Sequence, residues 1–281
     1  MAKKEKEPQY IMSALNTPML NYRTYVMDNQ EKTMTFLMAF IVGGIVGLAF
    51  YGGQFRDAEG IATTATQICN IVIFVLVGIA ATYIFFPMRA KQLKDKRRMQ
   101  LTQQFRSFLE ALGVALSSGM NVTESLYSVY DDLKAEYSQD AYMVAEVKEM
   151  IDGVQNNVPI EDMIVSLGER SEVEDIKNFG VVFSICYRAG GNMRDIVRRT
   201  NYILSEKIEI GEEIETSLAS NKSQFNAMMV IPVVMMLLLR LMSSSFAASF
   251  STVAGVTAIT IAIGLFVAAY KLGQKIMDIK G

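Results

Sequence analysis

Few residues in this 281-residue sequence have the types and spacing that catalysis or metal binding requires. The sequence contains no histidine, which excludes Ser-His-Asp and Cys-His catalytic arrangements and HExxH zinc sites. The pair Gly190-Gly191 has neither the lysine nor the further glycines of a phosphate-binding loop. The two cysteines, Cys69 and Cys186, form no CxxC motif, and because they fall in different environments we expect no disulfide between them.

Acidic side chains are the remaining candidates for chemistry, because carboxylates can bind metal ions or transfer protons. They are densest at Glu169, Glu172, Glu174 and Asp175. Acids scattered along a helix in this way are typical of a solvated face, so we expect no metal site there. The sequence therefore predicts a protein that is not an enzyme and that binds no cofactor or metal ion.

Two short glycine–asparagine segments, SSGMNVTESL and RAGGNMRDIV, form the most specific local pattern in the sequence. In each segment the glycine suits the left-handed residue that ends a helix, and the asparagine suits the N-cap of the next helix. An acid three residues later completes a capping box and lies near the positive end of the new helix dipole. The residues concerned are Gly119, Asn121, Glu124, Gly190, Gly191, Asn192 and Asp195.

We interpret these segments as structural corners between helices, with contact to a motor or a partner subunit as the alternative. One constant shift along the sequence carries Gly119 onto Gly190 and also carries the apolar residue Phe108 onto Phe179. Apolar positions thus keep their register on both sides of each corner, which favours internal duplication.

The elements that position the corners are helical throughout. Between Leu101 and Asn221 apolar residues recur at the spacings of three and four that are typical of a helix face. The alternating pattern of a strand is weaker than this helical pattern throughout the segment. The segment 88–224 is therefore predicted to be an all-α bundle of about six helices, built as two related three-helix halves.

Long uncharged stretches flank this segment on both sides. No charged residue lies between Lys32 and Arg56 or between Glu59 and Arg89, and Arg240 is the one charge between Lys222 and Lys271. A helix needs about 20 apolar residues to cross a bilayer. We therefore predict an integral membrane protein with four transmembrane helices, two in residues 34–87 and two in residues 225–270.

The distribution of lysine and arginine predicts the orientation of these spans. Basic residues concentrate in the N-terminal arm 1–33, in the bundle 88–224 and in the tail 271–281, whereas the connections within each pair of spans carry few. By the positive-inside rule we expect the arm, the bundle and the tail of this multi-pass membrane protein in the cytoplasm. The formal net charge is −2, so the chain has no excess of positive charge to attract nucleic acid, and we expect no nucleic-acid partner.

Two groups of basic residues near the spans are candidate contact sites. The cluster at Lys91, Lys94, Lys96, Arg97 and Arg98 suits a topology anchor near anionic lipid head groups, with docking to an acidic partner as the alternative.

Arg240 falls near the outer end of the third predicted span, where its side chain can reach the interface. A polar contact with another subunit or with a translocating substrate is the alternative for this arginine.

The order of these features resembles the type II secretion F domain. The resemblance is carried by SSGMNVTESL, GVQNNVPIEDMI, RAGGNMRDIV and the Ile231-Pro232 pair that opens the third span, and it covers about Phe105 to Tyr270. Two spans, one copy of the domain and two further spans is the arrangement of the tight-adherence (Tad) pilus platform proteins. The secretion and type IV pilus branch usually carries two cytoplasmic copies with three spans, so this chain is more similar to the Tad branch.

The resemblance implies a platform protein that couples a cytoplasmic hexameric ATPase to the assembly of pilin subunits. It also implies a paralogous platform protein, prepilin subunits and membrane lipids as partners, within a homo- or hetero-oligomer. Alternatives from other classes are a small transporter and a membrane-anchored signalling scaffold. The predicted spans lack the buried acids that mark a transport path, and the predicted outer connections are short for a sensing segment.

Overall fold

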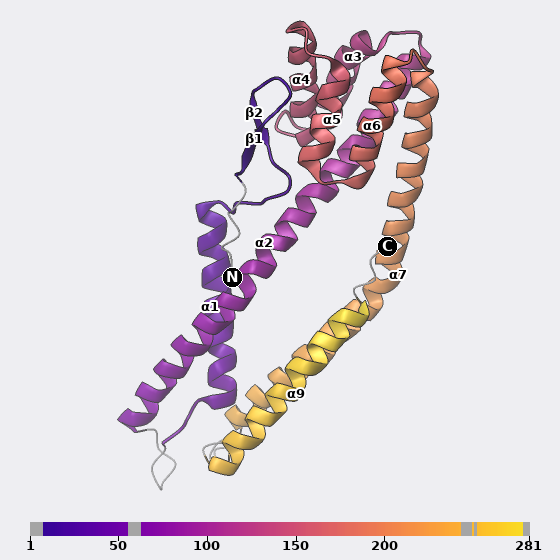
Figure 1. Ribbon diagram of the computed structural model, residues 1–281. Helices are drawn as coiled ribbons and strands as arrows, with labels where there is room; N and C mark the ends of the chain where they lie inside the picture. The colour runs from indigo at the N-terminus through magenta and orange to yellow at the C-terminus, as the bar shows by residue number, and fades with distance from the viewer. Residues whose placement is uncertain (1–7, 56–62, 243–248, 250–251, 278–281) are drawn as a thin grey trace. The chain divides into compact units, whose positions relative to one another are not determined.

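The computed structural model describes residues 8–55, 63–242, 249 and 252–277, and among these residues the chain is almost entirely helical (Figure 1). The side chains of a few helical residues, Arg240 among them, lie outside the description. The predicted all-α fold class is confirmed. The elements are β1 (Tyr10–Met12), β2 (Pro18–Leu20), α1 (Asn29–Tyr51), α2 (Thr64–Ser117), α3 (Val122–Glu136), α4 (Tyr142–Gln155), α5 (Ile160–Ser171), α6 (Glu174–Arg188), α7 (Met193–Met242) and α9 (Val253–Met277).

The chain forms two compact units. The first, here called the bundle, comprises the N-terminal residues to Val26 and residues Ala90–Ile210. The second, here called the span unit, comprises Met27–Arg89 and the residues from Gly211 onward. The chain passes from one unit to the other within α2 and within α7, and also between Val26 and Met27.

The bundle is built from the C-terminal part of α2, from α3, α4, α5 and α6, and from the N-terminal part of α7. Its centre contains aromatic rings from α2 and α6. Phe105 stacks on Phe108 at 5.6 Å between ring centroids and meets Phe179 edge-on at 5.5 Å. Phe108 and Phe179, which the sequence repeat superposes, are both buried in this core. The apolar stripes of the two repeats therefore meet at the centre of the bundle.

Helices α5 and α6 approach each other closely because both present glycine at the contact. A Cβ atom added to Gly168 would lie 2.8 Å from the Cα atom of Lys177, and one added to Gly180 would lie 3.2 Å from the Cα atom of Val165. Larger residues at these two positions would push the helix backbones apart.

The N-terminal residues 8–26 belong to the bundle. Strands β1 and β2 pair antiparallel with Ile11 opposite Met19, and the turn between them is closed by Ser13 N donating to Thr17 O at 2.8 Å. Figure 1 shows this hairpin beside α4 and α5. The sequence analysis finds no strand here, because three-residue strands are too short to show an alternating pattern.

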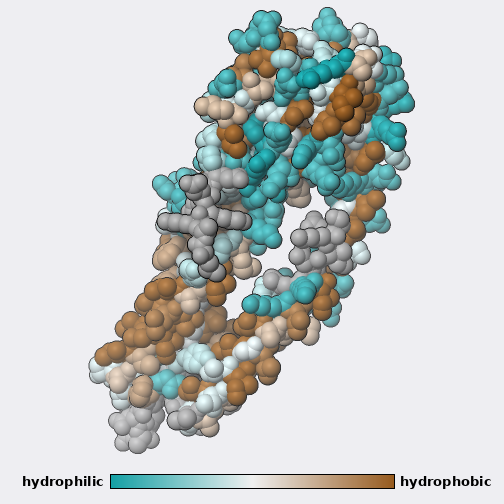
Figure 2. Space-filling model, viewed as in Figure 1, coloured by the Kyte–Doolittle hydropathy of each residue, from teal (hydrophilic) through white to brown (hydrophobic). Residues whose placement is uncertain are grey.

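Four helices within the described residues are long and apolar enough to cross a membrane. They are Asn29–Tyr51, Thr64–Ser117, Met193–Leu239 and Ala254–Gly273, so the predicted number of spans is confirmed. Figure 2 shows that hydrophobic residues dominate the visible surface of the span unit, whereas hydrophilic residues dominate that of the bundle. A hydrophobic outer surface is expected of helices whose surroundings are lipid.

Within the span unit, α1 packs on α2 through small residues. A Cβ atom added to Gly47 would lie 2.8 Å from the Cβ atom of Val77, and one added to Gly44 would clash with the ring of Phe74. Close approach through glycine is a common way for helices to associate where water supplies no hydrophobic driving force. Helices α7 and α9 meet through the stacked rings of Phe225 and Tyr270, whose centroids are 6.0 Å apart.

Candidate functional site

The first corner ends α2 with a left-handed glycine. Gly119 has a φ of +91°, its amide donates to Leu116 O at 3.2 Å, and the next amide, of Met120, donates to Ala115 O at 3.3 Å. A Cβ atom added to Gly119 would meet no heavy atom within 4 Å. Glycine is therefore required here by the backbone conformation and not by a lack of space.

The second corner repeats this geometry at the end of α6. Gly190 has a φ of +67° and its amide donates to Tyr187 O at 3.3 Å, while the amide of Gly191 donates to Cys186 O at 2.8 Å. Each donor and acceptor corresponds to its counterpart in the first corner under the sequence shift. The duplication seen in the sequence is thus also present in the backbone hydrogen bonds.

The helices that follow the corners begin with asparagine caps. The amide of Glu124 donates to Asn121 Oδ1 at 2.9 Å, and the amide of Asn121 donates to Glu124 Oε2 at 3.2 Å, which completes the predicted capping box of α3. At α7 the amide of Asp195 donates to Asn192 Oδ1 at a longer 3.4 Å, and Asn192 Nδ2 donates to Asp195 Oδ2 at 2.6 Å. The cap of α7 is the looser of the two.

The two corners lie side by side. The guanidinium of Arg194, in the first turn of α7, donates to Leu116 O at 2.9 Å in the last turn of α2 before the first corner. Val197 is fully buried, and one of its methyl groups would lie 3.7 Å from a Cβ atom added to Gly113. We call residues 117–121 and 189–195 together the corner surface.

Exposed apolar residues adjoin the corner surface in both halves. Val114 is 63% exposed on α2, and Ile185, its counterpart under the sequence shift, is 66% exposed on α6. Met120 lies within the first corner and is 41% exposed. Apolar side chains are thus exposed beside the polar caps of both corners.

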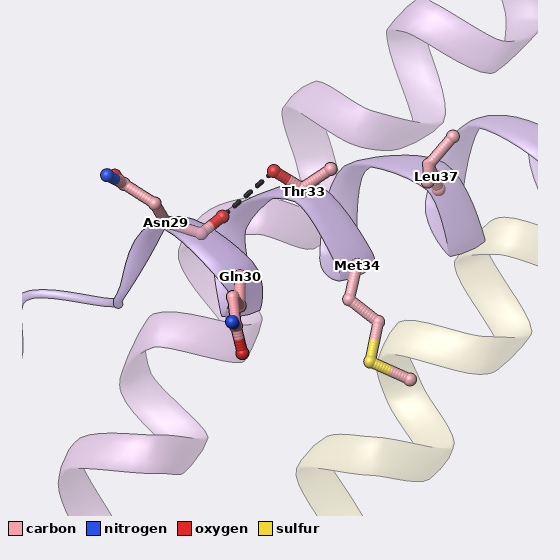
Figure 3. A pocket seen from close by; sticks show the side chains of 5 residues that line it. All are labelled: Asn29, Gln30, Thr33, Met34 and Leu37. Carbon is pink, nitrogen blue, oxygen red and sulfur yellow. Dashed lines mark hydrogen bonds between the residues drawn. The ribbon is translucent and has the colours of Figure 1, made fainter.

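The described residues offer little chemistry beyond contact. No three of their histidine, cysteine, aspartate or glutamate side chains are grouped to hold a metal ion. Figure 3 shows a shallow hollow on the first turns of α1, lined by Asn29, Gln30, Thr33, Met34 and Leu37. The one hydrogen bond drawn there runs from Thr33 Oγ1 to Asn29 O at 2.8 Å, within the helix itself. None of the five residues titrates near neutral pH, so the hollow has no acid or base for catalysis.

The basic cluster at residues 91–98 contains both side chains that are buried or paired within the protein and side chains that are exposed. Arg97 is buried and its guanidinium lies 4.3 Å from the centroid of the Tyr25 ring. Lys94 and Arg98 form ion pairs with Glu172, at 3.3 Å for Lys94. Burial lowers the pKa of Arg98. These three side chains contact the protein itself.

The remaining members of the cluster, Lys91 and Lys96, are exposed. The predicted contact of the cluster with lipid or an ATPase therefore concerns chiefly these two lysines.

A buried ion pair in the bundle was not anticipated from the sequence. Arg170 NH1 donates to Glu146 Oε1 at 2.8 Å and Arg170 NH2 donates to Glu146 Oε2 at 2.6 Å. The side chains of Arg170 and Glu146 are 5% and 1% exposed. Tyr22 from the N-terminal residues donates its hydroxyl to Glu146 Oε1 at 3.0 Å.

The pKa shifts follow from this geometry. Burial and the adjacent Glu146 carboxylate raise the pKa of Tyr22 well above its ordinary value. Burial opposes the charge on Arg170, but the hydrogen bonds to Glu146, together with the negative charge of Glu146 and the interactions with Tyr22 and Glu149, outweigh it and raise the pKa of Arg170. One feature of the sequence could have indicated this pair. Glu146 and Arg170 both fall on the apolar, buried face of their helices, near Val147 and Leu167.

A protein-family model matches part of this chain. The model of the type II secretion system protein F family matches residues 108–241. Over these residues, about half of its length, the chain is similar to that family. The match includes both corners and most of α7, and it confirms the resemblance stated from the sequence. No curated protein and no solved structure matches the chain.

The matched residues are similar to protein F of the type II secretion system, and the described residues include four helices long and apolar enough to cross a membrane. The matched residues begin within α2 and end within α7. They include the position of Arg240, whose side chain lies outside the description. The cluster at residues 91–98 and the N-terminal hairpin precede the matched residues.

Proposed function

We propose that this protein is the inner-membrane platform of a tight-adherence pilus or a related secretion machine, and that it couples a cytoplasmic hexameric ATPase to the assembly of pilin subunits. The observation that carries the proposal is the match to the F family at residues 108–241, which follows the apolar parts of the first two candidate spans, includes the third and precedes the fourth. In this arrangement the N terminus, the bundle and the C terminus lie in the cytoplasm, as the distribution of basic residues predicts.

The proposed coupling depends on helix continuity. Helices α2 and α7 each run without a break from the bundle into the span unit. Rotation or tilting of the bundle by the ATPase would therefore be transmitted along both helices. The turns of the transmembrane helices that adjoin the bundle would move with the bundle. This movement would lift pilin subunits from the bilayer into the growing filament.

The proposed partners follow from the surfaces. The corner surface, with Met120, Val114 and Ile185 beside it, suits contact with the ATPase or with a paralogous platform protein in a homo- or hetero-oligomer. The exposed Lys91 and Lys96 suit anionic lipid head groups at the membrane. Arg240 suits a polar contact with another subunit or with a pilin.

Deletion of the coding sequence tests the proposal. Cells that lack the protein should display no surface pili by electron microscopy, and a plasmid copy should restore them. Normal pili in the deletion strain would overturn the proposed function. Gentle-detergent purification of the tagged chain from native membranes should recover an ATPase and a second platform protein, and recovery of neither would contradict the proposed partners.

A further inference from the structure

Helix α3 and the start of α7 occupy equivalent places in the two halves of the bundle. The sequence shift that relates the corners carries Asn121, the cap of α3, onto Asn192, the cap of α7. It carries residues 122–136 onto residues 193–207. The first of these stretches contains four acids and one base, whereas the second contains four bases and two acids. Equivalent helices of the duplicated bundle are therefore oppositely charged.

Some of these charges are already engaged within the bundle. The one base of the α3 stretch, Lys134, lies over a tyrosine ring of its own helix, 5.7 Å from the centroid. On α7, Arg194 donates to the carbonyl oxygen of Leu116, and Lys207 pairs with Asp175 at 2.9 Å. The two bases in the middle of the α7 stretch have no such contact among the described residues.

Two pairs of adjacent like charges remain exposed. Asp131 and Asp132 are exposed on α3, and Arg198 and Arg199 are exposed on α7. None of these four residues forms an ion pair with any residue that the structure describes. Adjacent like charges repel each other, and an opposite charge placed alongside offsets that repulsion. The bundle thus carries one acidic and one basic surface, and each lacks a counter-charge.

An exposed tyrosine accompanies each charged pair. Tyr127 precedes Asp131 by about one turn and is 45% exposed, and Tyr202 follows Arg198 by about one turn and is 68% exposed. Under the sequence shift Tyr127 corresponds to Arg198, and Asp131 corresponds to Tyr202. A guanidinium binds the face of a tyrosine ring, and a phenol donates to a carboxylate. Equivalent positions on the two helices therefore carry side chains that attract one another.

The two helices also run in the same direction within the bundle. Arg194 contacts the last turn of α2, and Val197 lies beside Gly113, one turn earlier in α2, so α7 runs back along α2. At the end of α3, Glu136 accepts a hydrogen bond at 3.1 Å from Ser107, so α3 returns along α2 as well. Copies of a membrane-spanning chain share one orientation in the bilayer. Helix α3 of one copy and α7 of its neighbour can therefore meet in parallel, at equal distances from their corners.

We propose that the acidic surface of α3 binds the basic surface of α7 on a neighbouring copy of this chain. The acidic surface consists of Tyr127, Asp131 and Asp132, and the basic surface consists of Arg198, Arg199 and Tyr202. Each copy presents both surfaces, so the contact is heterologous and repeats from copy to copy. The role of this assembly rests on the proposed function, which it deepens by assigning the self-association surfaces, whereas the contact itself does not.

Charge reversal in the full chain tests the contact. One variant carries Asp131→Lys with Asp132→Lys, and the other carries Arg198→Glu with Arg199→Glu. Energy transfer between donor-labelled and acceptor-labelled chains in phosphatidylcholine vesicles measures association, and this lipid has no net charge that would compete for either surface. Each variant alone should associate at least about tenfold more weakly than the unmodified chain, because like charges then face each other.

A mixture of the two variants distinguishes this contact from a general loss of association. The lysines of one variant then face the glutamates of the other, so the dissociation constant of the mixture should return to within about threefold of the unmodified value. Lys177→Glu and Glu169→Lys change exposed charges on α6 and α5, and as matched controls they should leave association unchanged.

Three results would each refute the proposed contact: no association of the unmodified chain, no recovery in the mixture, or equal weakening by the control substitutions. All substituted side chains are exposed, so every variant should unfold at the temperature of the unmodified chain. These measurements use purified protein, so their outcome is independent of whether the chain assembles pili. Failure of the contact would leave the pilus proposal to its own test, and normal pili in a deletion strain would leave the contact intact.

Discussion

The guanidinium of Arg194 and the carbonyl oxygen of Leu116 lie 2.9 Å apart, and their hydrogen bond joins the two corners of the duplicated bundle. Leu116 lies in the last turn of the α2 helix, where carbonyl groups lack partners within the helix. A cation at that end also complements the negative pole of the helix dipole. The second repeat thereby stabilises the end of a helix in the first.

Replacement of Arg194 should weaken this junction. We expect Arg194→Ala to lower the free energy of unfolding by about 1 kcal/mol, because the carbonyl of Leu116 loses a charged donor. Thermal unfolding followed by circular dichroism measures the effect. Arg198→Ala, an exposed arginine one turn later on α7, is the matched control and should change stability by less than about 0.5 kcal/mol. Equal effects of the two substitutions would contradict the proposed stabilisation of the end of α2 by Arg194.

The two corner glycines should tolerate alanine poorly. Gly119→Ala and Gly190→Ala should each destabilise the bundle by about 1 kcal/mol, because alanine disfavours the positive φ at both positions. Gly211→Ala is the control: Gly211 also has no heavy atom within 4 Å of an added Cβ, but it lies inside α7. That change should stabilise by about 0.5–1 kcal/mol. Destabilisation by all three would point to crowding instead of backbone conformation.

The corners could be predicted from the sequence because their geometry is local. The left-handed glycine, the N-cap and the acid three residues later all lie within a few residues of one another, so their spacing alone specifies the bonds of Asn121 and Glu124. The spans could be predicted for a similar reason, since an uncharged run of sufficient length leaves a helix in lipid as its stable state.

The docking of the N-terminal residues 8–26 and the buried ion pair could not be predicted in this way. Ser13 and Glu149 are 136 positions apart, and Glu146 and Arg170 are 24 apart on different helices. Which acid meets which base depends on how α4 and α5 pack, and the periodicity of a single helix does not contain that information. Strands of three residues are likewise stabilised by what they dock on and not by their own propensity.

The buried ion pair should show strong coupling. Arg170→Met should lower the free energy of unfolding by about 3–5 kcal/mol, because it leaves the Glu146 carboxylate buried and unpaired. Adding Glu146→Leu should recover most of that loss, since both charges are then gone. A double-mutant cycle from denaturant unfolding gives the coupling energy. A double variant no more stable than Arg170→Met would show that packing, and not the unpaired charge, sets the cost.

Stability should fall in alkaline solution partly through Tyr22. Its folded pKa is raised above the ordinary value of 10.0, so the neutral phenol is favoured in the folded state. This contribution is complete below pH 10 and declines as the pH rises from there toward the folded pKa, because the unfolded chain loses the proton first. Tyr22→Phe cannot ionise and should show a shallower decline. Unfolding free energies of the two proteins across this range, compared at matched ionic strength, measure the difference, and parallel curves would contradict it.

The corner surface should carry partner contacts under the proposed function. Ile185→Asp places a charge on an exposed apolar position beside the second corner, where an apposed surface would have to desolvate it. We expect recovery of the ATPase or the second platform protein from native membranes to drop by about tenfold, which corresponds to a loss of about 1.4 kcal/mol. Val181→Asp, about one turn further from the corner on the same helix and 48% exposed, is the control. Unfolding temperatures of both variants should match the unmodified chain, because neither side chain lies in the core. Undiminished recovery with Ile185→Asp, or equal losses with both variants, would show that the partner does not bind at the corner surface.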